Sequence, residues 1–142
     1  MATVTITGTA ANYAVSSSNV TLINLGTVGG TAGVDVGYGL SGDVLLNAAI
    51  ISVGGTGLGV RLNSAANLTN QSGGTISGYK AVIAYNQPST VTNSGAIIGA
   101  LTAALGAGVQ FINEGTPTNQ LSATVSGYSG VIANAGGTVT NS

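Results

Sequence analysis

The sequence predicts an all-β fold, a parallel β-solenoid of about six coils of about 23 residues. Three observations lead to this prediction: an asparagine recurs every 23 residues, a longer segment repeats almost unchanged, and short β-rich runs alternate with corners rich in Gly, Asn and Ser. Such a period is too short for a helix pair, and no amphipathic helical pattern is present. Because one coil cannot bury its inner face alone, the coils must stack.

The recurring asparagine sets the length of a coil. Its positions, spaced by 23 residues, are Asn24, Asn47, Asn70 and Asn93. Four to six positions after each comes a β-branched residue, namely Val28, Ile51, Ile76 or Ile97. We expect the four asparagines to stack at one corner, each side-chain amide bonding to the amide above it.

The longer repeat carries the pattern into the last part of the chain. Residues 75–94 and 124–142 are identical at 13 of 19 aligned positions when Tyr85 is skipped. Their offset is about two coil lengths. Both stretches are therefore expected to form the same part of a coil, about two coils apart.

One coil breaks the regular period. Asn141 follows Asn93 by close to two periods, whereas Asn113 falls out of step between them. We therefore expect a single solenoid domain, residues 1–142, with an irregular coil or an insertion near residues 99–120.

Short runs rich in β-branched residues are the expected strands. They are Val4–Ile6, Val20–Ile23, Val44–Leu46, Gly59–Leu62, Ala81–Ala84, Val109–Ile112 and Gly130–Ala133. Inward Val, Ile and Leu side chains of successive coils should stack at the strand spacing of about 4.8 Å. Gly is frequent at the joints because tight corners require positive φ.

The composition excludes several classes of function. The charged side chains are only Asp35, Asp43, Arg61, Lys80 and Glu114, and there is no His, Cys or Trp. Zinc, iron and copper therefore lack their usual ligands, and we predict no cofactor or metal. Two basic residues cannot neutralise a phosphate backbone, so no nucleic-acid partner is expected.

Hydropathy gives no reason to expect membrane insertion. No run approaches the roughly 18 apolar residues that a membrane-spanning helix requires. A basic region followed by an apolar core is not present after Met1, so we expect no Sec signal peptide.

Residues 90–99, TVTNSGAIIG, resemble the repeats of bacterial autotransporter passengers and related secreted adhesins, which typically read TVTNSGTISG. Residues 70–78 and 138–142 are similar to the same repeat. The resemblance implies a right-handed parallel β-helix at the bacterial cell surface or outside the cell, in an adhesin-like or biofilm-matrix role. It implies an architecture and no particular activity. Passengers are much longer, so their membrane anchoring and self-transport do not carry over to this sequence.

Catalytic and calcium sites are poorly supported. Solenoid enzymes that cleave polysaccharides need carboxylates within about 5–10 Å of each other. Asp35 and Asp43 lie on different parts of one coil, and Glu114 is about three coils away, so no enzyme is predicted. Residues 29–36 approach a calcium-binding repeat, but this motif occurs only once.

Two ligand-binding alternatives stay open. Residues 3–7 begin a Thr rank of the kind that binds ice, but the position before each ladder asparagine reads Ile23, Leu46, Thr69 and Thr92, so we expect no continuous rank. A surface polysaccharide is the second alternative, because tyrosine rings stack on sugars. The tyrosines are Tyr13, Tyr38, Tyr79, Tyr85 and Tyr128, and we favour a packing role for them.

The two ends give the main functional hypothesis. No charged side chain precedes Asp35 or follows Glu114, and neither end resembles the polar cap of a solenoid. Residues 2–8 resemble the second half of a repeat, residues 74–78, and would follow Asn141 in phase. We therefore expect copies to stack head to tail into an extracellular filament.

The expected axial contacts are Val4, Ile6, Val139 and Asn141. A charged residue or proline at Val4 or Val139 should block stacking and leave single rods. The alternative is a stalk segment of a longer autotransporter-like adhesin, which would also begin and end in repeats.

Overall fold

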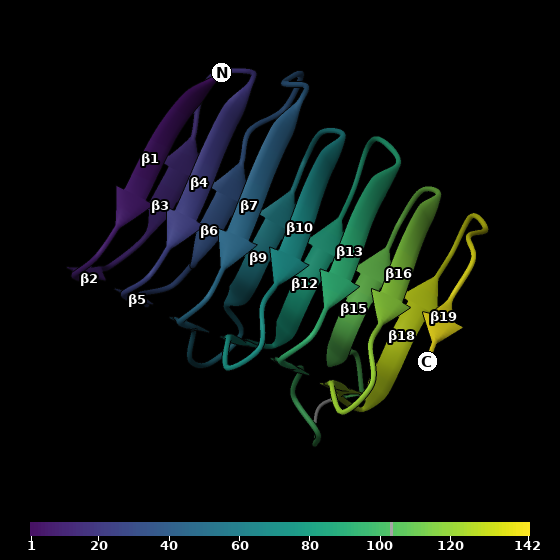
Figure 1. Ribbon diagram of the computed structural model, residues 1–142. Helices are drawn as coiled ribbons and strands as arrows, with labels where there is room; N and C mark the ends of the chain where they lie inside the picture. Colours follow the sequence, from purple (N-terminus) through teal and green to yellow (C-terminus); the bar gives the residue numbers. More distant parts are fainter. Residues whose placement is uncertain (103) are drawn as a thin grey trace.

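The computed structural model describes residues 1–102 and 104–142 and confirms the all-β parallel solenoid. The described residues form nineteen strands and no helix, arranged in three parallel sheets of seven, six and six strands. The chain winds in a right-handed sense from the N-terminal to the C-terminal end (Figure 1). Each coil adds one strand to every sheet, so six complete coils are followed by one further strand.

The three sheets are named A, B and C. Sheet A consists of β1 (Ala2–Ile6), β4 (Val20–Asn24), β7 (Asp43–Asn47), β10 (Ala66–Asn70), β13 (Ser89–Asn93), β16 (Gly115–Asn119) and β19 (Thr140–Asn141). Sheet B consists of β2 (Thr9–Ala10), β5 (Thr27–Val28), β8 (Ile50–Ser52), β11 (Thr75–Ser77), β14 (Ala96–Ile98) and β17 (Thr124–Ser126). Sheet C consists of β3 (Tyr13–Val15), β6 (Val34–Val36), β9 (Leu58–Leu62), β12 (Lys80–Ala84), β15 (Ala107–Phe111) and β18 (Ser129–Ala133).

All seven predicted strands are present, and all belong to sheets A and C, as β1, β4, β7, β9, β12, β15 and β18. The strands of sheet B were not predicted as strands. They are short, so each directs a single side chain inward, such as Ile51 or Ile76. One apolar residue between two corners gives no alternating pattern for sequence analysis to detect.

One hydrophobic core runs along the solenoid. In sheet A, Leu22, Leu45, Leu68 and Val91 lie opposite one another in register, and all are buried. In sheet C, Phe111 lies between Ala84 and Ala133 of the neighbouring coils. A Cβ on Gly115 would lie 1.9 Å from the Phe111 ring. The large ring therefore fits because three neighbouring positions are small.

The irregular coil lies between β14 and β15. The register step along sheet A is 26 residues from Asn93 to Asn119. The next step, from Asn119 to Asn141, is 22 residues. Eight residues separate the end of β14 from the start of β15, whereas only residues 78 and 79 separate β11 from β12. The asparagine in register is therefore Asn119, which the strict period did not identify.

A tight corner makes one glycine indispensable. Gly33 has φ of +55°, and a Cβ there would lie 2.0 Å from the Gly59 carbonyl oxygen. We expect Gly33→Ala to lower the free energy of unfolding by at least about 2 kcal/mol, from the left-handed backbone and the clash together. Urea denaturation measures this loss. Gly54→Ala is the matched control, since no atom lies within 4 Å of its Cβ position, and it should change stability little.

Candidate functional site: the asparagine ladder and the two ends

The asparagines of sheet A form a continuous ladder along one corner. Each Nδ2 donates to the Oδ1 of the next asparagine, at 2.7 Å from Asn24 to Asn47 and 2.8 Å for the two steps to Asn70 and Asn93. The ladder then continues at 2.8 Å to Asn119 and at 2.9 Å to Asn141. The second N–H of each amide is directed to backbone carbonyls, for example those of Ala49, Gly74 and Gly95. Buried amides are thereby satisfied.

The ladder has a direction. Every amide donates toward the C-terminal end, where Asn141 is exposed. At the N-terminal end Ile6 lies opposite Asn24 and takes the ladder position. The Asn24 oxygen accepts the backbone N–H of Gly26 at 3.2 Å and has no amide donor from β1. The two ends therefore differ chemically: one presents a primary amide and the other an isoleucine.

The N-terminal end presents three strand edges. Within the described residues, β1, β2 and β3 each pair on one side only. Ile6 and Val15 are buried there, whereas Val4, Ala10 and Tyr13 are partly buried against the core. This end is therefore an apolar surface with backbone groups free to pair.

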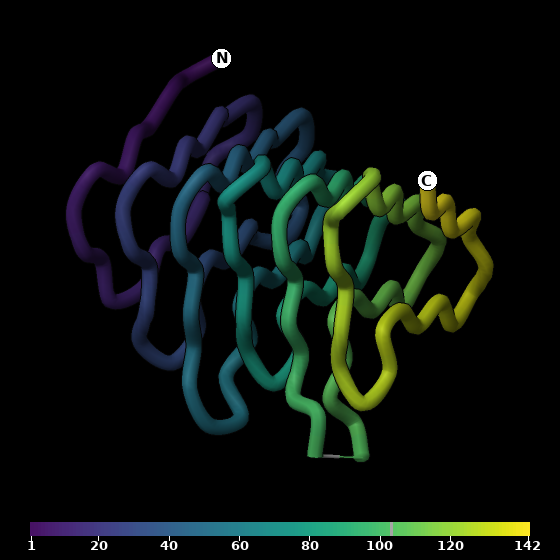
Figure 2. Tube along the Cα trace, turned by 60° about the horizontal axis from the view of Figure 1, so that its bottom comes forward, coloured from purple at the N-terminus to yellow at the C-terminus, as the bar shows by residue number. Residues whose placement is uncertain are grey.

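The C-terminal end is hollow. The edge strands there are β17, β18 and β19. A cavity of about 260 Å³ opens between them, lined mainly by Val91, Val109, Val125, Val131 and Val139. Val139 is 54% exposed. The first and last coils lie at opposite ends of the solenoid in Figure 2, so the two surfaces cannot meet within one chain.

The structure corrects the phase assigned to the beginning of the chain. β1 pairs with β4 so that Val4 lies opposite Leu22 and Ile6 opposite Asn24. Residues 2–6 are thus a first strand of a coil, and their alignment with residues 74–78 was wrong. An alternating Thr/Val run matches either half of the repeat, and only stacking in sheet A decides between them. Both ends consequently carry a strand of the same sheet.

The outer face of sheet A carries a longer Thr rank than the sequence indicated. Thr69, Thr92, Thr118 and Thr140 lie in register on four successive strands. Thr90 and Thr116 form a second column beside them, with their hydroxyl oxygens 3.4 Å apart. The column that begins at Thr5 is interrupted by Ile23 and Leu46, as expected, and the step to Asn119 adds Thr118 and Thr140 to the part that begins at Thr69.

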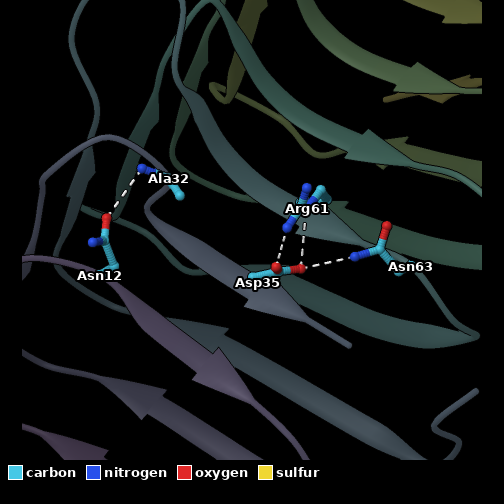
Figure 3. A network of polar contacts seen from close by, with 5 residues as sticks. All are labelled: Asn12, Ala32, Asp35, Arg61 and Asn63. Carbon is cyan, nitrogen blue, oxygen red and sulfur yellow. Dashed lines mark hydrogen bonds and ion pairs between the residues drawn. The ribbon is translucent and has the colours of Figure 1, made fainter. Parts of the chain in front are cut away.

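Among the described residues, one ion pair is present, on sheet C (Figure 3). Arg61 on β9 donates from Nε to Oδ1 of Asp35 on β6 at 3.1 Å and from Nη2 to its Oδ2, while Asn63 donates to Oδ1 at 2.8 Å. The hydrogen bond from Arg61 to Asp35 raises the pKa of the guanidinium above its ordinary value. Asp35 and Arg61 are separated by 26 residues, which is longer than the period of 23 residues. The period therefore did not predict that they pair.

The remaining carboxylates lie apart from this pair. Asp43 is buried and accepts the backbone N–H of Val20 at 2.9 Å, and Glu114 is exposed. Within residues 1–102 and 104–142, no three His, Cys, Asp or Glu residues are grouped as metal ligands.

We expect the Asp35–Arg61 pair to contribute below about 1 kcal/mol, because the Arg61 side chain is 41% exposed and solvent screens it. A double-mutant cycle with Asp35→Asn and Arg61→Gln, followed by urea denaturation, measures the coupling. The coupling should decrease in high salt. A coupling well above this value, or one insensitive to salt, would contradict the expectation.

Comparison of the chain with protein-family models, with curated proteins and with solved structures finds no match. Among the described residues, no helix has the length and hydropathy of a membrane span. The functional inference therefore depends on the surfaces of the solenoid itself.

Proposed function

We propose that this chain is a structural protein whose copies stack head to tail into an extracellular or cell-surface filament. The observation that carries the proposal is the pair of open ends: three strand edges with apolar side chains at one end, and three edges around an apolar hollow at the other. Unpaired edges of parallel sheets accept further strands of the same spacing. A contact between unlike ends does not close, so it generates a filament.

The distribution of charge supports association. All five charged side chains lie between residues 35 and 114, and none belongs to the edge strands β1, β2, β3, β17, β18 and β19, where it would repel a second copy. The resemblance to secreted β-helix repeats supports a position outside the cell. We assign no catalytic role, no cofactor and no nucleic-acid partner, and we propose that the partner is the chain itself.

Negative-stain electron microscopy of the purified protein over a dilution series tests the proposal. We expect long filaments of uniform width at high concentration. Val4→Lys should abolish them, because it places a charge in the apolar edge of β1. Thr92→Lys is the control, since it adds the same charge on the outer face in the middle of sheet A and should leave filaments unchanged.

The principal alternative is a stalk segment of a longer adhesin. It predicts short single rods at every concentration, with identical behaviour of Val4→Lys and the unmodified chain. That result would overturn the filament proposal and direct attention to what such a stalk carries.

The Thr rank favours a second candidate, ice binding. Hydroxyl groups repeating at about 4.8 Å on a flat sheet face form a regular array that ordered water can match. Inhibition of ice recrystallisation by the unmodified chain tests this candidate. Thr92→Lys should abolish the inhibition while leaving filaments intact, so one variant separates the two functions.

A further inference from the structure

We infer that, in the filament, β1 of one copy replaces β19 of the preceding copy and pairs directly with β16. This inference rests on the proposed head-to-tail assembly and specifies its mechanism. It follows from the strand count: sheet A has seven strands, whereas sheets B and C have six.

The coil geometry makes β1 and β19 competitors for one position. Within the chain, β1, β2 and β3 are followed in register by β4, β5 and β6, one strand in each sheet. A second copy that continues all three sheets must therefore place its β2 on β17, its β3 on β18 and its β1 on β16. β19 already pairs with β16. Direct stacking without exchange would leave sheets B and C one strand short at the junction.

The two competing segments share a run of three residues. Residues 3–5 and residues 138–140 both read Thr-Val-Thr. Val91 pairs with Pro117 in the core column that begins at Val4. Gly115 pairs with Gly137 and Thr118 with Thr140, so Val139 lies in that same column. β1 of a second copy therefore presents the same side chains as residues 138–140, and it differs at the ladder position, where Ile6 takes the place of Asn141.

β19 is held less firmly than the strand that would replace it. It has two residues, whereas β1 has five. Residues 133–142 are exposed throughout. Exchange gives up the bond from Asn119 to Asn141, but Asn119 keeps its bond to the carbonyl of Ala123 at 2.9 Å.

The incoming coil also fills the hollow. Tyr13 lies in register with Val34, in the column that continues through successive coils to Val131. In the exchanged junction, Tyr13 would cover Val131 and Ala10 would cover Val125, while β2 and β3 satisfy the free edges of β17 and β18. Tyr13 is larger than the valines that occupy this column in the other coils, and it would lie against the cavity of about 260 Å³.

A reversible lock on β19 tests the inference. The chain has no cysteine, so paired cysteines introduced at Thr118 and Thr140 can form only the intended intramolecular bridge or an intermolecular one. These positions lie in register on neighbouring strands, whose spacing of about 4.8 Å suits a disulfide. The matched control pairs cysteines at Thr69 and Thr92, in register in the middle of the same sheet. Mass spectrometry and thiol titration verify that each bridge has closed.

We expect the oxidised Thr118→Cys/Thr140→Cys chain to lose filament growth and to recover it fully on reduction, while the control grows in both states. Growth of the oxidised chain at the wild-type rate would overturn the exchange. An unmodified chain that never forms filaments would instead overturn the proposed function, so the two failures are distinguishable.

Two further variants give an independent measurement. In mixed filaments, Thr5→Cys should cross-link to Thr118→Cys and not to Thr140→Cys, because β1 occupies the place of β19. Cross-linking mainly to Thr140→Cys would show that copies stack on β19 and would overturn the exchange. Val139→Lys should leave filament growth intact, in contrast to Val4→Lys and to the expectation from the sequence, because the exchange displaces Val139 from the junction.

Discussion

We expect Phe111→Ala to lower the free energy of unfolding by about 3–5 kcal/mol, the range for removing a buried aromatic ring. Phe111 is completely buried, and it is the largest buried side chain of the solenoid. Its neighbours in the column are Ala84 and Ala133, and Gly115 lies against the ring. These neighbours are alanines and a glycine, so none has a side chain large enough to fill the space left by the ring. The cavity would therefore persist.

Urea denaturation followed by circular dichroism measures this loss. Leu101→Ala is the control, because Leu101 is 64% exposed and should change stability by less than about 0.5 kcal/mol. A second variant, Phe111→Leu, retains most of the apolar volume and should cost far less than alanine. Equal losses for alanine and leucine would contradict the view that the ring fills a space left by small neighbours.

We expect Asn70→Ala to lower the free energy of unfolding by about 2–4 kcal/mol, since buried polar groups would lose their partners. The Asn70 amide donates to Asn93, to Gly74 and to Ala96, and its oxygen accepts from Asn47. Alanine removes all four interactions in the centre of the ladder. The remaining amides on both sides would be buried with unmade hydrogen bonds.

Two controls isolate the contribution of the ladder. Asn141→Ala makes the same chemical change at the exposed end and should alter stability by less than about 0.5 kcal/mol. Thr69 is the outward-facing neighbour of Asn70 and takes no part in the ladder. Thr69→Ala should therefore also have little effect on stability. A similar loss for Asn70→Ala and Asn141→Ala would mean that the ladder does not contribute through its buried bonds.

The ladder also bears on assembly. It is unbroken from Asn24 to Asn141, but Ile6 occupies the equivalent position at the N-terminal end. In a filament the amide ladder is therefore interrupted at every junction, where apolar contacts take its place. We expect filaments to separate at junctions before single coils unfold.

The sequence by itself determined the parallel solenoid, the coil length and seven of the thirteen strands of sheets A and C. These follow from local features: alternating apolar residues that must face inward, and an asparagine that returns every 23 residues. The same period placed Asn24, Asn47, Asn70 and Asn93 at one corner. It also indicated an irregular coil or an insertion near residues 99–120, and eight residues separate β14 from β15.

Only the tertiary structure decided which residues stack wherever a coil departs from the period. A step shorter than the period, from Ile6 to Asn24, assigned β1 to sheet A. A longer step, from Asn93 to Asn119, extended both the ladder and the Thr rank, and another brought Arg61 beside Asp35. The physical reason is that corners tolerate insertions and deletions, while register is set by the burial of side chains against the next coil.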